Sequence, residues 1–292
     1  MGRGGYGGPR GVRRAGLSDP SPSIRPMHPE TLLGDVVELP PGRRVAAGQG
    51  DGGPAPLWLS DGPAPFGAWG PIRAAHARTG LWPLLLEPLA GDTGFRPWAS
   101  GELFPGASGP ADHDPAAVLA RWWEDGVSVD EDEDPLSAGE RLAVTAPYGA
   151  AWPGLAPGRT PVEDPDRLAD EHAEVLLSFG TDARLGLVEA GSGAEALAAS
   201  GWSGPANHAD TARIAAVVAD WERRFGARVF AVGFDTLRLS VAAPPTTLEE
   251  ALPVAAEHFA FCPDNVWQGH VDDLAAYAGH LVGADAWTFW WD

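Results

Sequence analysis

The chain has 292 residues, 44% of them hydrophobic and 13 of them Trp, so it can bury the core of one large domain or two smaller ones. Its formal net charge is −20, because 40 acidic residues face 20 Arg and no Lys. Residues 161–292 hold 21 acids and 7 Arg, so −14 of this charge lies in the C-terminal part. Such a surface repels nucleic-acid phosphates and anionic membranes, and it would attract a basic protein partner.

The single cysteine, Cys262, cannot form an internal disulfide, so the fold needs no oxidising compartment. No apolar run is long enough to cross a bilayer, and the N-terminal arginines are not followed by the apolar segment of a secretory signal. We therefore expect a cytoplasmic protein that binds neither membranes nor nucleic acids.

Residues 1–29 are predicted to be a disordered arm. They are rich in Gly, Arg and Pro and contain almost no side chains that could join a core. Met27 is an alternative to Met1 as the start of translation, and the sequence leaves that choice open.

Residues 30–145 are predicted to form an N-terminal α/β region. A helix is expected at 71–79, with Pro at its first position and Gly after its end, and another begins at Asp114. Residues 146–165, rich in Pro and Gly, are predicted to be a loose linker. Short apolar runs bounded by Pro and Gly predict strands at 35–39, 56–59 and 81–87.

Residues 166–292 are predicted to be a C-terminal α+β domain. Its clearest helix covers 211–225, where apolar residues recur at helical spacing. Glu222, Arg223 and Arg224 lie off this apolar stripe and are predicted to be solvated. Alternating apolar runs on either side of Asp235 predict two strands joined by a tight hairpin.

The last fifty residues predict two more helices and a strand. The capping box Thr246-x-x-Glu249 opens a helix that Pro263 ends, and a second helix is expected at 272–281. The closing strand at 286–292 is expected inside the sheet, because exposing its aromatic side chains would cost about 1.5–3 kcal/mol each. The predicted fold class is α/β to α+β: a mixed sheet with covering helices, built from two α/β units.

The segment Gly191-Ser192-Gly193-Ala194-Glu195-Ala196 matches the dinucleotide fingerprint G-x-G-x-x-A after a predicted strand. Asp210 follows near the distance at which a ribose-binding acid is expected. The helix after the motif is only about two turns long, however, and no second strand completes a βαβ unit. We therefore expect a turn that starts a short helix, and no cofactor.

Four segments of the C-terminal part resemble the C-terminal domain of unknown function 4253, a family typical of actinobacterial proteins of this size. They are GWSGPANH (201–208), AVVADWERRFGARVFAVGFDTLRLSVAAPP (216–245), AAEHFAFCPDNVWQG (255–269) and WTFWWD (287–292). The resemblance covers roughly the last third of the chain. It implies the domain but no activity, since the family has no established one.

The residues 257–268 hold the densest set of reactive side chains. His258 and Cys262 are four residues apart and share a helix face, and a His beside a Cys can make a thiolate nucleophile. One Cys and one His are too few ligands for a structural zinc, so no metal is expected. The candidate catalytic residues are His258, Cys262 and Asp264, and the candidates for ligand or partner contacts are Trp221, Asp235, Glu257, Asn265, Trp267 and Gln268.

Two functional hypotheses follow. The preferred one is a non-enzymatic, acidic binding module of the cytoplasm with a basic protein as its partner; an immunity-type protein is one form of it, and the oligomeric state is left open. The alternative is a small hydrolase or transferase that uses Cys262 as nucleophile and His258 as base, with nearby carboxylates holding the imidazole. A structural role explains the same residues without catalysis: Cys262 packs, Pro263 ends the helix, and Asp264 and Asn265 bind the freed backbone groups.

Overall fold

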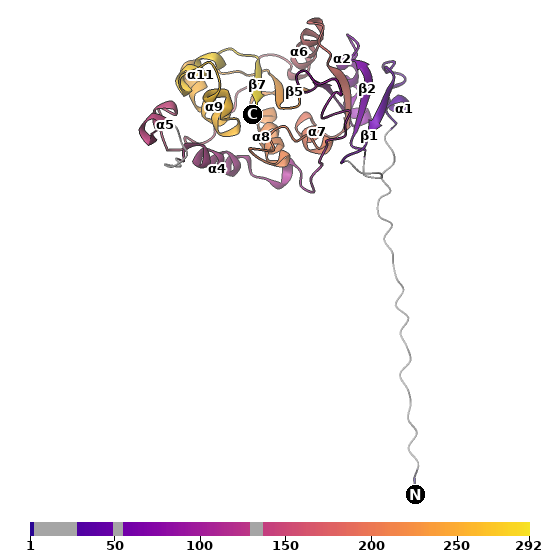
Figure 1. The fold of residues 1–292 in the computed structure, drawn as a ribbon, viewed down its shortest axis with the longest axis horizontal. Coiled ribbons are helices and arrows are strands. Elements are labelled where there is room, and N and C mark those ends of the chain that lie inside the picture. Colours follow the sequence, from indigo (N-terminus) through magenta and orange to yellow (C-terminus); the bar gives the residue numbers. More distant parts are fainter. Residues whose placement is uncertain (3–27, 49–54, 129–136) are drawn as a thin grey trace.

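The computed structural model describes residues 1–2, 28–48, 55–128 and 137–292. Within these residues seven strands form one mixed sheet with helices on both faces, which confirms the predicted fold class (Figure 1). Most of the predicted disordered arm, including Met27, lies outside the described residues. No helix in the described ranges is both long and apolar enough to cross a bilayer.

The strands follow the order β1-β2-β4-β3-β5-β6-β7 across the sheet. Only β3 and β5 are parallel, and every other neighbouring pair is antiparallel. The strand predicted at 35–39 is wrong, because Val36 and Val37 donate their N–H groups to the Leu33 carbonyl in a turn. The strands are β1 (Gly42–Val45), β2 (Leu57–Pro63), β3 (Leu81–Leu86), β4 (Arg184–Glu189), β5 (Ala227–Val232), β6 (Thr236–Val241) and β7 (Ala286–Trp290).

The helices cover the sheet unequally. On one face α1, α2 and α6 enclose a smaller core around Trp69, and on the other α4, α7, α8, α9 and α11 enclose a larger core around Trp221. The helix predicted at 71–79 is split into α2 and α3. The bounds are α1 (Pro29–Leu33), α2 (Trp69–Ala74), α3 (His76–Thr79), a 3-10 turn (Pro110–Asp112), α4 (Pro115–Val127), α5 (Ala138–Val144), α6 (Pro165–Ser178), α7 (Gly193–Ser200), α8 (Thr211–Phe225), α9 (Leu248–Phe261), α10 (Asp264–Trp267) and α11 (Leu274–Leu281).

Strands from the two predicted regions interleave in this sheet. β4, from the part predicted as the C-terminal domain, lies between β2 and β3 and pairs with β3 over six consecutive residue pairs. Backbone hydrogen bonds through the middle of one sheet therefore join the regions 30–145 and 166–292. The stretch 146–165 is anchored to α9 at Ala156, which is buried and donates its N–H to the Glu257 carboxylate at 2.6 Å.

Two details of the C-terminal elements differ from expectation. β7 lies at the edge of the sheet and not inside it. Its aromatic face, Trp287, Phe289 and Trp291, is nevertheless buried, because the helices of the larger core cover it. The cap of α9 is shifted by one residue, since the Thr247 hydroxyl accepts from the Glu250 N–H at 3.2 Å.

Candidate functional site

The end of α9 and the loop after it link three predicted candidates in one chain of hydrogen bonds. His258 Nδ1 lies 3.1 Å from the hydroxyl oxygen of Tyr277 on α11. That oxygen accepts from Asn265 Nδ2 at 3.0 Å, and Asn265 Oδ1 lies 3.4 Å from Cys262 Sγ, whose single proton it shares with the Trp290 carbonyl. The imidazole and the thiol are therefore linked through two other side chains, and the described structure shows no direct hydrogen bond between them.

His258 is a packed, neutral histidine. It is fully buried among the rings of Trp221, Trp287 and Phe289, with centroids 4.5 to 5.1 Å away. Burial lowers the pKa of its imidazole to about 3. Which of Nδ1 and the Tyr277 hydroxyl donates in their hydrogen bond depends on the tautomer of the imidazole. Nε2 has no hydrogen-bond partner among the described residues, so it faces the surrounding rings alone.

Cys262 is the buried cap residue at the end of α9. Its side chain is 0% exposed, and its Sγ–H donates to the Trp290 carbonyl at 2.9 Å. Burial raises the pKa of the thiol to about 12, so the thiolate that a nucleophile requires is scarce at neutral pH. In the described part of the chain, no three His, Cys, Asp or Glu side chains gather so as to hold a metal ion.

The backbone of β7 explains why these side chains lie where they do. The Trp291 N–H donates to the Asp235 carbonyl, and the Asp285 carbonyl accepts from the Val241 N–H. The backbone N–H and C=O groups of the odd-numbered residues therefore point toward β6. Successive residues of a strand point their backbone groups to opposite sides. The backbone groups of the even-numbered residues of β7 therefore point away from the sheet, where an edge strand has no neighbouring strand to pair with.

Residues 262–265, which we call the edge clip, supply hydrogen-bond partners for backbone groups on this free edge. Three of their side chains bond to the backbone of three alternate residues: Thr288 and Trp290 in β7, and Asp292 just after it. An unpaired strand edge is a template for pairing with another chain, and the clip covers it. The contacts are Asn265 Nδ2 to Thr288 O (2.8 Å), Cys262 Sγ to Trp290 O (2.9 Å) and Asp292 N to Asp264 Oδ2 (3.2 Å).

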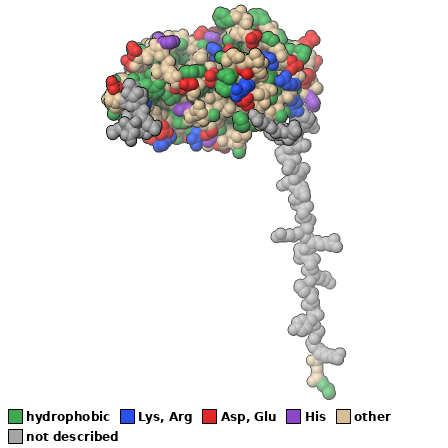
Figure 2. All heavy atoms as spheres, in the orientation of Figure 1, with side chains coloured by type: hydrophobic (Ala, Val, Ile, Leu, Met, Phe, Trp, Pro, Cys, Tyr) green, Lys and Arg blue, Asp and Glu red, His purple; other side chains and the backbone are tan. Residues whose placement is uncertain are grey.

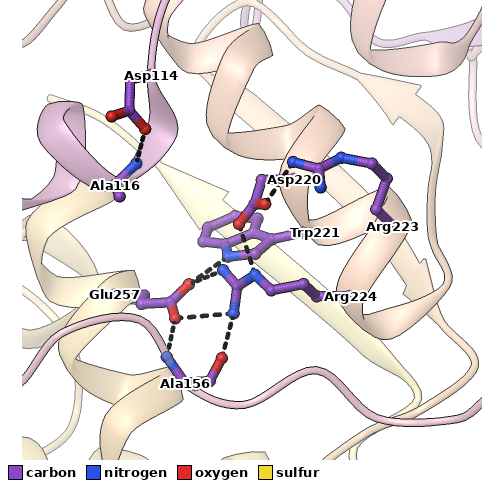
Figure 3. A network of polar contacts seen from close by, with 8 residues as sticks. All are labelled: Asp114, Ala116, Ala156, Asp220, Trp221, Arg223, Arg224 and Glu257. Atoms are coloured by element: carbon purple, nitrogen blue, oxygen red, sulfur yellow. Dashed lines mark hydrogen bonds and ion pairs between the residues drawn. The ribbon is translucent and has the colours of Figure 1, made fainter.

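Glu257 and Trp221, both predicted as ligand contacts, belong to a buried ion-pair network (Figure 3). The Glu257 carboxylate is 0% exposed and accepts from Trp221 Nε1, from the Ala156 N–H and from two nitrogens of Arg224. Burial raises the pKa of this carboxyl, and Arg224 is the main opposing influence. Arg224 also donates to Asp220 and to the Ala156 carbonyl, which ties α8, α9 and the 146–165 stretch together.

Residues 184–292 match the family model described as Domain of unknown function (DUF4253). The match covers the C-terminal part of the chain. The resemblance seen in the sequence is thereby confirmed, and every candidate residue lies inside the matched region. No curated protein and no solved structure matches the chain. The DUF4253 region begins at β4, so the strands that pair with β4 on both sides lie outside the match.

The remaining candidates of the DUF4253 region lie apart from His258. Asp235 is partly exposed in the β5–β6 turn. Trp267 on α10 packs against Phe259 and carries the Arg141 guanidinium over its ring at 4.7 Å. Gln268 is exposed and donates to Asp264. These side chains therefore do not gather around one pocket with His258 and Cys262.

The dinucleotide-like motif starts α7, as expected, and the start of this helix is already occupied. Ser192 caps the helix, the Glu195 carboxylate accepts from the Gly191 N–H at 2.8 Å, and the Glu222 carboxylate accepts from the Ala194 N–H at 3.0 Å. The prediction that Glu222 is solvated is wrong for this reason, and burial raises the pKa of its carboxyl. Two of the protein's own carboxylates lie where a phosphate would have to bind.

Sequence reasoning missed Tyr277 and misplaced Arg224. Arg224 was predicted to be solvated, yet only 13% of its side chain is exposed. Asp220 stands four residues before it, a spacing that signals an ion pair on a helix. No comparable local signal exists for Tyr277, because its partners His258 and Asn265 come from outside its own helix.

Proposed function

We propose that the protein is a non-enzymatic binding module of the cytoplasm that recognises a basic protein partner. The supporting observation is the position of its carboxylates. The chain has 40 acidic residues, and Asp220 and Glu257 are the buried ones in the described ranges. Figure 2 displays acidic side chains spread over the visible face. An excess of exposed negative charge steers and orients positively charged partners.

The geometry around Cys262 favours binding over the alternative, a hydrolase or transferase. A Cys/His enzyme needs a thiolate, an imidazole that takes up the thiol proton, and room for substrate. Here both side chains are 0% exposed, and burial moves the two pKa values in the directions that keep the thiol protonated and the imidazole neutral. The Cys262 thiol is already engaged with the Trp290 carbonyl of β7.

The proposal has a more specific form. An immunity-type protein binds a toxic enzyme and blocks it, and an acidic surface suits one whose target is basic. A single buried cysteine suits a reducing compartment such as the cytoplasm, where free thiols are the normal state.

Affinity capture from lysate of the native host, followed by mass spectrometry, tests the proposal. The bait is the full chain, and the control bait is an unrelated protein of similar size and net charge. We expect the full chain to enrich a basic protein that the control does not, and high salt to release it, because exposed charge pairs are screened. The same proteins on both baits, or no salt-sensitive partner, would contradict the proposal.

A further inference from the structure

A groove opens beside the first turn of α9. Its volume is about 590 Å³, within the range of about 300–1,000 Å³ that small-ligand pockets occupy. Pro253 supplies a half-buried apolar floor, Pro157 is exposed at one side, and Phe225 and Val254, which also line the groove, are almost fully buried. Glu249 and Glu250 stand at its rim. The groove is therefore apolar below and negatively charged above.

The charges around the groove point to a cation. Glu250 is paired with Arg159 at 2.6 Å, which neutralises both. Glu249 is exposed, and no hydrogen bond or ion pair engages it within the described part of the chain, so its charge remains available. The start of α9 is capped by its own side chains: the Thr247 hydroxyl accepts from the Glu250 N–H, and the Glu250 carboxylate accepts from the Thr246 N–H.

The chain itself shows how such a rim holds a basic side chain. Arg159 donates its backbone N–H to the Arg224 carbonyl while its guanidinium reaches Glu250 and the Thr246 hydroxyl. A lysine or arginine from outside would lay its aliphatic stem on the apolar floor and place its charge at Glu249. Leu248, 48% exposed beside Glu249, adds apolar surface for the residues that flank such a side chain.

We propose that this groove receives a lysine or arginine side chain of the basic partner. The proposal rests on the proposed function and names the place where that function is exercised. The bound group is the side chain of a protein, since the groove combines one free carboxylate with an apolar floor and an exposed leucine.

Saturation-transfer NMR with small probes tests the assignment on the full chain. The probes are N-acetyl-arginine methylamide and N-acetyl-lysine methylamide, and the matched neutral probe is N-acetyl-norleucine methylamide. We expect saturable binding of the two basic probes and weaker binding of the neutral one. Glu249→Gln should weaken the basic probes about threefold to fivefold, as an exposed ion pair implies. Glu171→Gln is the control, because Glu171 is an exposed acid of α6 on the other face of the sheet.

The outcomes separate this proposal from the one it rests on. Equal binding of all three probes, equal loss in Glu249→Gln and Glu171→Gln, or no saturable binding of either basic probe would overturn the groove assignment. A basic partner that full chain and Glu249→Gln capture equally would leave the proposed function standing and remove the groove from it. Unchanged thermal unfolding of both variants shows that any loss is local.

Discussion

Cys262 is a thiol that the fold keeps away from water and away from a base. Burial raises its pKa to about 12, so the thiolate is scarce at pH 7. We therefore expect iodoacetamide to modify the folded protein far more slowly than the same protein unfolded in guanidinium chloride. Mass spectrometry over a time course measures both rates. Fast, stoichiometric labelling of the folded chain would revive the enzymatic alternative.

Arg224 and Arg223 are neighbours on α8 that differ in burial, so they form a matched pair. The Arg224 side chain is 13% exposed and faces the buried Glu257, whereas the Arg223 side chain is 70% exposed. Arg224→Met leaves a buried carboxylate without its cation and should lower the free energy of unfolding by about 3–5 kcal/mol. Arg223→Met should cost less than about 1 kcal/mol, as for an exposed pair. Urea unfolding at pH 7 compares them.

A double variant shows how much of the stability loss in Arg224→Met comes from the buried charge that is left unpaired. If the loss in Arg224→Met comes from an unpaired buried charge, then Arg224→Met combined with Glu257→Leu should recover part of it, because both charges are gone. Equal stability losses in the Arg223 and Arg224 variants would show that the buried network of Figure 3 contributes no more than surface charge.

At the scale of elements, the edge clip is the feature that the position of β7 requires. The Asn265 amide satisfies both the Thr288 carbonyl and the Tyr277 hydroxyl. Asn265→Ala should therefore lower the free energy of unfolding by about 1–3 kcal/mol, the cost of leaving such groups unpaired. Gln268→Ala, in the same loop but exposed, should change it by no more than about 0.5 kcal/mol.

Self-association gives a second measure of the clip. Opening the outer edge of β7 exposes backbone groups that another strand can pair with, so Asn265→Ala should also form concentration-dependent oligomers. Analytical ultracentrifugation of Asn265→Ala and Gln268→Ala at several concentrations tests this. If the two variants sediment alike and are equally stable, the clip does not protect the edge.

At the scale of the whole molecule, the DUF4253 region depends on the chain that precedes it. β4 is its first element, and β2 and β3, which flank β4, lie outside the match. Residues 184–292 alone would expose the buried Leu185, Leu187 and Val188, at about 1.5–3 kcal/mol for each large side chain. They would also lose the Ala156 N–H that Glu257 accepts from.

We therefore expect residues 184–292, expressed alone, to lack a cooperative unfolding transition that the full chain shows. Circular dichroism with heating, and amide exchange of both samples, make the comparison. Residues 137–292 are the intermediate control, since they restore Ala156 and α6 but not β2 and β3. A sharp transition in the shortest fragment would mean that the matched region folds by itself.

The candidate site was predictable in part. Its residues, their burial and their role as partners of backbone groups follow from a helix that a proline ends and from polar side chains that come directly after it. The identity of those backbone groups did not follow, because β7 is 23 or more residues further along the chain than the clip residues that bond to it. Trp221 and Glu257 were predicted as ligand contacts; in the structure Glu257 accepts from both Trp221 and Arg224, a pairing that the sequence did not indicate.

The sequence by itself determined the elements whose signals are local: the α8 stripe of Ile214, Val217, Val218 and Trp221, the β5–β6 hairpin, and the helix that Pro263 ends. Periodicity, turns and caps act over a few residues, so one segment carries the whole signal. Only the tertiary structure decided that β4 enters between β2 and β3, that β7 is an edge, and that Arg224 is buried against Glu257. Each of these depends on pairing between distant segments, and a strand or a charge looks the same in sequence whichever partner the fold brings to it.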